Sequence, residues 1–248
     1  DMENLKSSLA DMLVGAGIDS DGIEINPIYG GGNNRVVSVQ TKAGKYLAKT
    51  YYSHPSDTRN RLAAEYAFLS YALNIGLDCV PKPIFCDQKN NIGLYEFVEG
   101  RKLRNSELTQ QHIMEAASFI KGLNDRQDRD QTLPTASEGC FSIERHFSII
   151  DERLNRLRHL PVESELDRKV ISFVKEIENA WKSIKDEISS GDGSISKELN
   201  AKDRCISPSD FGFHNALLKN SGEVCFIDFE YAGWDDPAKM VGDFFLQP

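Results

Sequence analysis

Three polar residues near the end of the chain have the types and spacing of a metal–phosphate site. Asp210 and Asn215 fit the pattern D-x-x-x-x-N, and Asp228 follows an apolar run in "VCFIDFE". Carboxylate and amide oxygens are the hard ligands that Mg²⁺ prefers. An ionised carboxylate with apolar neighbours is costly unless it is paired or bound to a metal. Asn215 and Asp228 are therefore candidate metal ligands, and Asp210 could accept or orient the proton of a reacting hydroxyl.

Phosphoryl transfer also requires a segment that binds phosphates, and a glycine run is the candidate. Gly30, Gly31, Gly32 and Asn33 lie in "GGGNN", directly before a predicted strand. Glycines allow the backbone to approach phosphates closely and to offer N–H donors. Taken alone, such a run is more often a flexible turn. It is not the loop GxxxxGK[ST], because no Lys-Ser/Thr follows at the required spacing.

A lysine and a glutamate in the N-terminal part supply the charges that such a site needs. Lys49 lies in "YLAKT", which reads as a strand, and Glu65 lies in the helical pattern that follows. A lysine that faces inward is costly unless it meets an anion. Glu65 could then direct Lys49 toward phosphate oxygens. Either residue alone would more commonly be a solvated charge, but chance is a poor explanation for the complete ordered set.

The hydrophobic pattern predicts two regions of different character. Residues 3–17 and 58–75 are helical patterns, and short strand patterns occupy most of the remaining positions up to Gly100. After Gly100 come three long helical patterns and then two strands that form a hairpin. The helical patterns cover residues 107–123, 143–158 and 165–188. We therefore expect a β-rich nucleotide-binding lobe over residues 1–100 and a mostly helical lobe over 101–248 that carries the catalytic loop and metal site.

The composition is that of an ordinary globular protein. The chain has 248 residues, of which 40% are hydrophobic and 27% are charged. Its net charge of −9 argues against a protein that binds nucleic acid. The five cysteines lack metal-ligand spacing, which favours reduced thiols in a cytoplasmic protein. No signal peptide or membrane span is indicated, so a membrane partner is not expected.

Several segments occur in an order that resembles the aminoglycoside phosphotransferase/choline kinase family. These are "GGGNNRVVSV", "YLAKTYY", the helix with Glu65, "LYEFVEG", "SDFGFHNALL" and "IDFEYAGWDDPA". They span residues 28–238, and the last string is the most specific of them. The resemblance implies an α+β, protein-kinase-like two-lobe fold. It has a small β-rich N-lobe and a mainly helical C-lobe with a catalytic-loop hairpin.

The resemblance also assigns roles to the five residues already singled out. It implies that Lys49 contacts the phosphates of ATP or GTP and pairs with Glu65. It implies that Asp210 is the catalytic aspartate, and that Asn215 and Asp228 hold Mg²⁺. Each of these roles is an expectation carried over from the family pattern.

The purine and acceptor sites are implied less directly. In "YEFVEG", main-chain groups near Glu96 and Val98 would bind the purine. The acceptors of the family are hydroxyls on small molecules, many of which carry an amine. Glu230, Asp235 and Asp236 could present negative charge to such a cation, or could simply be surface acids.

The chain departs from the family pattern in two places. Pro208 and Ser209 stand where the family usually has His-Gly, which bears on the geometry of the catalytic loop. His214 is not at the position of the family histidine, and we interpret it as incidental. Family members usually continue with further helices past "DFEYAG". The sequence also begins with Asp1, so we expect it to be a fragment.

Three functional hypotheses follow. The first is an enzyme that moves the γ-phosphate of ATP or GTP in line to a hydroxyl of an aminoglycoside-, choline- or sugar-like acceptor. The second is a catalytically silent nucleotide-binding module that acts through protein partners. Pro208-Ser209 favours this module, whereas the intact phosphoryl-transfer residues oppose it. The third is a binding scaffold built on the helices at 143–188, although their apolar stripes are better explained as core.

Overall fold

The computed structural model describes residues 2–29, 34–55, 57, 59–125, 132–191 and 193–247. The chain divides into two compact units. The first consists of Asp1–Ser137 together with Cys205–Pro248, and the second is Glu138–Arg204. The lobe boundary expected at Gly100 stays a prediction. Within the described residues, none of the helices combines the length and the apolar character that a bilayer crossing requires.

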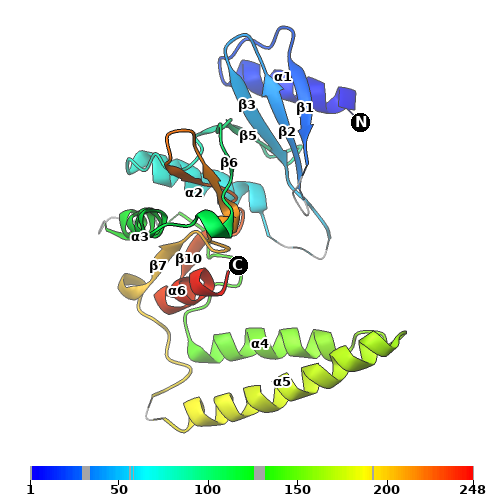
Figure 1. Ribbon diagram of the computed structural model, residues 1–248, viewed down its shortest axis with the longest axis vertical. Helices are drawn as coiled ribbons and strands as arrows, with labels where there is room; N and C mark the ends of the chain where they lie inside the picture. The colour runs from blue at the N-terminus through cyan, green and yellow to red at the C-terminus, as the bar shows by residue number, and fades with distance from the viewer. Residues whose placement is uncertain are drawn as a thin grey trace. The chain divides into compact units, whose positions relative to one another are not determined.

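The first unit opens with a helix and a five-stranded antiparallel sheet (Figure 1). The helix is α1 (Met2–Gly15), and the strand order is β1-β2-β3-β5-β4. The strands are β1 (Glu24–Ile28), β2 (Arg35–Gln40), β3 (Lys45–Thr50), β4 (Pro83–Asp87) and β5 (Ile92–Glu96). The central strand β3 places Lys49 opposite Val36 on one side and Gly93 on the other.

Apolar residues of α1 and of the sheet form one core. The buried face of α1 contributes Leu5, Leu9, Met12 and Leu13. The strands contribute Val37, Val39, Ala48, Ile92 and Leu94. Burial of this kind stabilises by roughly 25 cal/mol for each Å² of apolar surface removed from water. The core therefore holds β3, and with it Lys49, in a fixed position.

The helix α2 (Arg61–Asn74) follows β3 and contacts β4 and β5. Asn60 caps its N-terminus, because the Asn60 side chain accepts a hydrogen bond from the Ala63 N–H. The buried face of α2 carries Leu62, Phe68 and Leu69, and one acid, Glu65. A buried carboxylate requires a partner. The fold supplies it from β3.

The remainder of the first unit surrounds an aromatic cluster. Two small antiparallel sheets have the orders β6-β8-β9 and β10-β7. Their strands are β6 (Arg101–Lys102), β7 (Cys205–Ser207), β8 (Ala216–Leu218), β9 (Val224–Phe226) and β10 (Gly233–Asp235). The helices are α3 (Gln110–Asn124) and α6 (Pro237–Leu246), with short 3-10 turns η1 (Asn105–Glu107) and η3 (Phe213–Asn215). Contacts among Phe119, Phe211, Phe226 and Phe229 join α3 to the segments that carry the candidate site.

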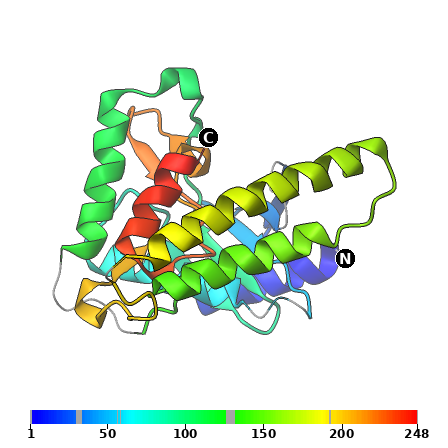
Figure 2. The same ribbon diagram turned by 90° about the horizontal axis from the view of Figure 1, so that it is seen from below.

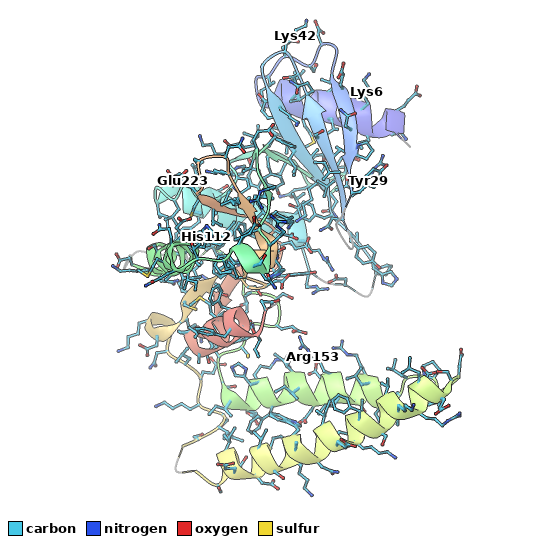
Figure 3. All side chains as sticks on the ribbon, viewed as in Figure 1. Lys6, Tyr29, Lys42, His112, Arg153 and Glu223 are labelled. Carbon is cyan, nitrogen blue, oxygen red and sulfur yellow. The ribbon has the colours of Figure 1, made fainter. Side chains whose placement is uncertain are left out.

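The second unit is a helical hairpin, and its two long helices lie side by side (Figure 2). They are α4 (Ile143–Arg158) and α5 (Glu165–Ser189), followed by the turn η2 (Ala201–Asp203). Phe147 of α4 meets Trp181 of α5 edge to face, with ring centroids 5.3 Å apart. Arg153, labelled in Figure 3, pairs with Glu138 near the start of the unit. Both long helices were expected from the sequence.

Candidate active site

Lys49 lies at the centre of a group of carboxylates. Its Nζ is 2.8 Å from Glu65 Oε2, 2.5 Å from Asp228 Oδ1 and 3.5 Å from Glu230 Oε2. The Lys49 and Glu65 side chains are 8% and 6% exposed. Burial by itself works to lower the pKa of Lys49, but Glu65, Asp228 and Glu230 outweigh it and raise that pKa. Lys49 therefore stays protonated, as a cation that binds phosphate must.

Glu65 is held by partners on both of its oxygens. Oε2 accepts a hydrogen bond from the Tyr51 hydroxyl at 2.5 Å, in addition to the one from Lys49. Oε1 accepts from the Phe229 N–H at 3.1 Å. Burial, and then Glu65 itself, raises the pKa of Tyr51 well above its ordinary value, so its hydroxyl remains a donor. Glu65 is therefore a fixed anchor that joins Lys49 to the segment after β9.

A second tyrosine extends this network, and a glycine makes room for it. The Tyr95 and Tyr51 hydroxyls are 2.5 Å apart. A Cβ at Gly93 would lie 2.4 Å from the Tyr95 hydroxyl, so the side chain of Tyr95 occupies the space above Gly93. A larger residue at Gly93 would displace the tyrosine. The packing of Tyr95 therefore explains why residue 93, in "IGLYEF", is glycine.

Asp228 has an uncommon backbone conformation and a partly open side chain. Its φ is +71°, in the left-handed region that non-glycine residues seldom adopt. The preceding residue, Ile227, donates its N–H to the Asn215 carbonyl at 2.9 Å, which ties this segment to the loop that includes η3. The Asp228 side chain is 42% exposed although Lys49 holds one oxygen. Strained residues of this kind gather at functional sites.

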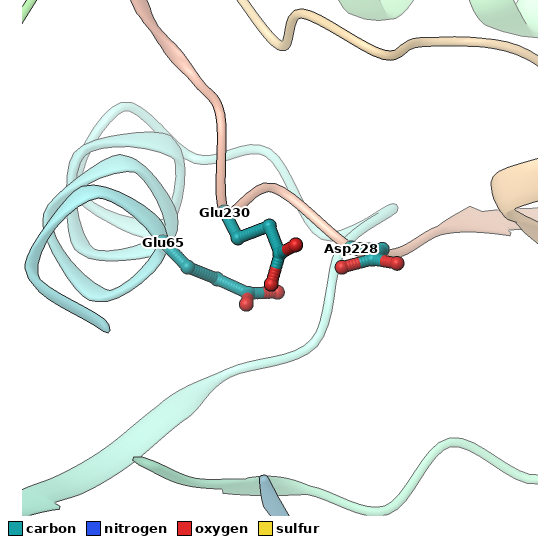
Figure 4. A group of neighbouring side chains, drawn as sticks. All are labelled: Glu65, Asp228 and Glu230. Atoms are coloured by element: carbon teal, nitrogen blue, oxygen red, sulfur yellow. The ribbon is translucent and has the colours of Figure 1, made fainter. Parts of the chain in front are cut away.

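The carboxylates of Glu65, Asp228 and Glu230 converge (Figure 4). One oxygen from each lies within 4.8 Å of the others. Lys49 forms ion pairs with all three residues and compensates part of their charge. Three converging carboxylates without cations would repel one another.

Asp210 and Asn215 meet in the loop that includes η3. The Asn215 Nδ2 donates to the Asp210 main-chain carbonyl at 3.0 Å and lies 3.4 Å from Asp210 Oδ2. Among the residues that the structure describes, none donates to the Asn215 side-chain carbonyl. An amide whose nitrogen is engaged in this way presents its oxygen as an acceptor. That oxygen suits a hard cation.

Two neighbours that sequence reasoning missed hold the Asp210 carboxylate. Gln247 Nε2 donates to Asp210 Oδ1 at 3.1 Å, and His214 Nε2 lies 3.4 Å from the same oxygen. The Asp210 side chain remains 41% exposed. The interpretation of His214 as incidental is therefore wrong for the geometry. The four-residue spacing from Asp210 was the available signal, whereas nothing local indicated Gln247.

Comparison with known proteins identifies the family. The model of the phosphotransferase enzyme family, APH, matches residues 24–239. The chain belongs to this family. A search of curated protein sequences gave no significant match.

Solved structures with the same fold have low sequence identity to this phosphotransferase family member. A choline kinase from Cryptosporidium parvum superposes with a TM-score of 0.67 at 17% identity, covering 99% of this chain and 69% of that one. Spectinomycin phosphotransferase APH(9)-Ia, in complex with ADP and spectinomycin, superposes with a TM-score of 0.64 at 16% identity. The match covers 97% of this chain and 73% of that one. The choline kinase LicA from Streptococcus pneumoniae superposes with a TM-score of 0.63 at 16% identity. The match covers 98% of this chain and 74% of that one. The predicted α+β, protein-kinase-like fold is thereby confirmed.

Ser209, which stands where this phosphotransferase family usually has glycine, has a left-handed backbone conformation. Ser209, directly before Asp210, has φ +54°. Its N–H is bound to Ser207 Oγ at 3.0 Å, and both serines are buried. Glycine adopts positive φ without a Cβ penalty, whereas serine does so under strain. The backbone directly before Asp210 is therefore strained at a serine that the Ser207 side chain holds in place.

The acids proposed to attract a cationic acceptor are engaged within the protein. Glu230 is buried and binds Arg61 Nη1 at 2.9 Å. Asp235 is fully buried and lies 3.0 Å from Lys239 Nζ. Asp236 caps α6 by accepting from the Ala238 N–H. Glu230 and Asp235 are therefore neither surface acids nor open to a cationic acceptor, and the Asp236 carboxylate is engaged as a helix cap.

The two expected purine-binding positions differ in their main-chain bonding. Glu96 ends β5, and its N–H donates to the Lys82 carbonyl at 2.9 Å. For Val98, the described part of the chain provides no hydrogen-bond partner to either main-chain group. Val98 is thus the position with main-chain groups available to a ligand. The glycine run, Gly30–Asn33, lies outside the described residues.

Proposed function

We propose that this protein transfers the γ-phosphate of ATP or GTP to a hydroxyl group of a small molecule, with Mg²⁺. The observation that carries the proposal is the convergence of Lys49, Glu65 and Asp228 within direct hydrogen-bonding distance. Membership of the phosphotransferase family supports the same reaction class. Phosphoryl transfer depends mainly on positioning and on charge stabilisation, and these residues supply both.

Lys49 is the proposed phosphate-binding cation. Its ammonium is held by Glu65 and by Asp228. Phosphate oxygens would replace the carboxylate of Asp228 as acceptors for Lys49. Asp228 would then be available to a metal ion. Glu65 would keep the lysine in place throughout, because its other contacts do not involve the nucleotide.

Asn215 and Asp228 are the proposed metal ligands. The partly exposed carboxylate of Asp228 and the side-chain carbonyl of Asn215 are hard oxygen donors, so the residues fit Mg²⁺. When bound, Mg²⁺ would neutralise phosphate charge and orient the triphosphate. Glu230 is less suited because it already binds Arg61.

Asp210 is the proposed catalytic base. The acceptor oxygen would form a bond to the γ-phosphorus while the bond from that phosphorus to the β,γ-bridging oxygen breaks. The proton of the acceptor hydroxyl would pass to the Asp210 carboxylate. Gln247 and His214 restrict the orientation of this carboxylate. Main-chain groups near Glu96 and Val98 would bind the purine, and the glycine run Gly30–Asn33 would cover the phosphates.

The acceptor is proposed as a hydroxyl-bearing metabolite or antibiotic, of which an amine-bearing compound is one class. Structures of the same fold include choline kinases and a spectinomycin phosphotransferase. The net charge of −9 is compatible with a cationic acceptor. Because the three acids after β9 are internally engaged, acceptor recognition would depend on other residues.

Calorimetric titration of ATP and GTP, with and without Mg²⁺, tests the proposal. The variants are Asp228→Ala, Asp210→Asn and, as a matched exposed-acid control, Asp21→Ala. We expect Mg²⁺-dependent binding that Asp228→Ala abolishes and the control retains. Asp210→Asn should bind nucleotide nearly as the wild type does and should abolish turnover once an acceptor is found. A folded wild type that binds neither nucleotide would refute the proposal. Binding without turnover across an acceptor panel would favour the silent module.

A further inference from the structure

We propose that Lys102 is a second phosphate-contacting cation, which binds the γ-phosphoryl group that is transferred. This inference rests on the proposed function and adds a catalytic residue to it. Lys102 follows "EFVEG" and lies far in sequence from the residues of the D-x-x-x-x-N motif. The sequence pattern gave no reason to select it.

Strand pairing brings Lys102 to the catalytic loop. It is the second residue of β6, and it pairs with Leu217 of β8, which directly follows the η3 turn. The Lys102 Nζ donates to the His214 main-chain carbonyl at 2.8 Å. His214 immediately precedes Asn215, the proposed metal ligand. The ammonium therefore lies against the short loop that carries the proposed catalytic groups.

The charge of Lys102 is not matched by a carboxylate. Lys49 and Arg61 each bind acids of the site, whereas no carboxylate of the described residues lies within salt-bridge distance of Lys102 Nζ. The His214 carbonyl is neutral and engages one of the three ammonium N–H groups. Two donors and a full positive charge remain for another acceptor.

The electrostatic surroundings point the same way. Although the Lys102 side chain is exposed overall, desolvation lowers its pKa, and the field of Asp228 acts in the opposite direction. The ammonium is thus partly shielded from water and close enough to Asp228 to sense its charge. An anion that joins such a cation would offset its partial desolvation. The proposed reaction brings one to Asp228, namely the phosphate chain of the nucleotide.

If Lys102 only supported the loop that contains His214, this position would not require a lysine. A neutral donor of similar length could bind the His214 carbonyl without the penalty of a shielded charge. The neighbouring Arg101 provides the contrast. Its guanidinium forms hydrogen bonds to both oxygens of Glu107, so it is an ordinary paired surface charge. Both residues lie on β6, but Arg101 pairs with a carboxylate whereas Lys102 contacts a neutral carbonyl.

The test compares the affinities of MgATP and MgADP, which requires no knowledge of the acceptor. The variants are Lys102→Met, Lys102→Gln and Lys102→Arg, with Arg101→Met as the matched control on the same strand. We expect Lys102→Met and Lys102→Gln to weaken MgATP about tenfold while MgADP changes less than about twofold, the size of one charge-assisted hydrogen bond. Lys102→Arg should restore most of the difference, and Arg101→Met should behave as the wild type does.

The outcomes separate this proposal from the function on which it rests. Equal weakening of MgATP and MgADP would mean that Lys102 only supports the loop, and unchanged affinities would mean that it does neither. Either result overturns the role of Lys102 and leaves the proposed function intact. If Lys102→Met lowers the melting temperature, Lys102→Gln decides, because its amide can still donate to the His214 carbonyl. A wild type that binds neither nucleotide would overturn both proposals.

Discussion

The Lys49 site and the α4–α5 hairpin both contain ion pairs, but they differ in how much water surrounds them. Lys49 and Glu65 are 8% and 6% exposed, and Lys49 also binds Asp228. In the hairpin, Lys185 and Asp151 are 30% and 48% exposed at a similar separation of 2.8 Å. Exposed pairs contribute little to stability, whereas an unpaired buried charge carries a large penalty. Ion pairs of similar length therefore differ between the two regions in how much their removal should destabilise the protein.

The two regions also differ in backbone conformation. Near the site, Ser209 and Asp228 adopt positive φ values without being glycine. The hairpin helices are regular, and each begins with a serine that caps it, Ser142 for α4 and Ser164 for α5. Asp167 completes a capping box at the second of these. Local preferences are satisfied in the hairpin and overruled at the site, which is expected where geometry serves chemistry.

The largest effect is expected from removal of the buried cation. Lys49→Met leaves Glu65 and its carboxylate neighbours without their shared partner, and should destabilise the first unit by about 3–5 kcal/mol. The matched change in the hairpin, Lys185→Met, removes an exposed partner and should cost under about 1 kcal/mol. Urea denaturation followed by circular dichroism measures the first change. Hydrogen exchange of α4 and α5 measures the second.

A loss below about 1 kcal/mol in Lys49→Met would contradict the comparison, given the usual cost of an unpaired buried charge. It would mean that protonation or water relieves the carboxylates at neutral pH. Equal losses in the two variants would show that burial does not distinguish the two regions.

The sequence predicted those features of the fold whose causes are local. The periodicity of α1, α4 and α5 was sufficient to find these helices. The ordered motifs were sufficient to place Lys49 on a strand, Glu65 on a helix and Asp228 just after an apolar strand. That these three side chains meet is a structural result consistent with the motif order. Their roles in catalysis stay predictions.

The features that were missed depend on long-range pairing. β1 contains Pro27, a residue that argues against a strand, but β1 lies at the edge of the sheet, where proline is tolerated. The contact between Gln247 and Asp210 requires α6 to fold back. The contact between Lys102 and the His214 carbonyl depends on the pairing of β6 with β8. No local window of sequence contains either partnership.

A smaller effect is expected where the backbone is strained. Ser209→Gly should stabilise the first unit by up to about 1 kcal/mol, because glycine adopts φ +54° without the Cβ clash that serine suffers. The same substitution in the hairpin, Ser183→Gly, should destabilise α5 by about 0.5 kcal/mol, because glycine is a poor helix former. Thermal unfolding of both variants shows whether each substitution raises or lowers the melting temperature. If both destabilise, the Ser209 conformation carries no strain that glycine relieves.

The smallest effect concerns the exposed pair of the hairpin and its dependence on pH. The hydrogen bond from Lys185 lowers the pKa of Asp151, burial opposes this, and the hydrogen bond from the Trp181 indole at 2.8 Å adds to the lowering. A carboxyl group whose folded pKa is depressed contributes stability above its unfolded pKa, about 4, and loses that contribution as the pH falls through the folded value. The hairpin should therefore be unaffected between pH 7 and 5 and weaken only below about pH 4.

The Trp181 indole N–H resonance reports this titration directly, because Asp151 is its hydrogen-bond acceptor. Its chemical shift should change with a midpoint below the ordinary carboxyl value, and Asp151→Asn should remove the change. The substitution should cost under about 1 kcal/mol at pH 7, since the pair is exposed. A midpoint at or above the ordinary value would mean that Lys185 and Trp181 do not hold the carboxylate in solution. The contact of Phe147 with Trp181 and the capped helices would then stabilise the hairpin without a measurable contribution from the Lys185–Asp151 pair.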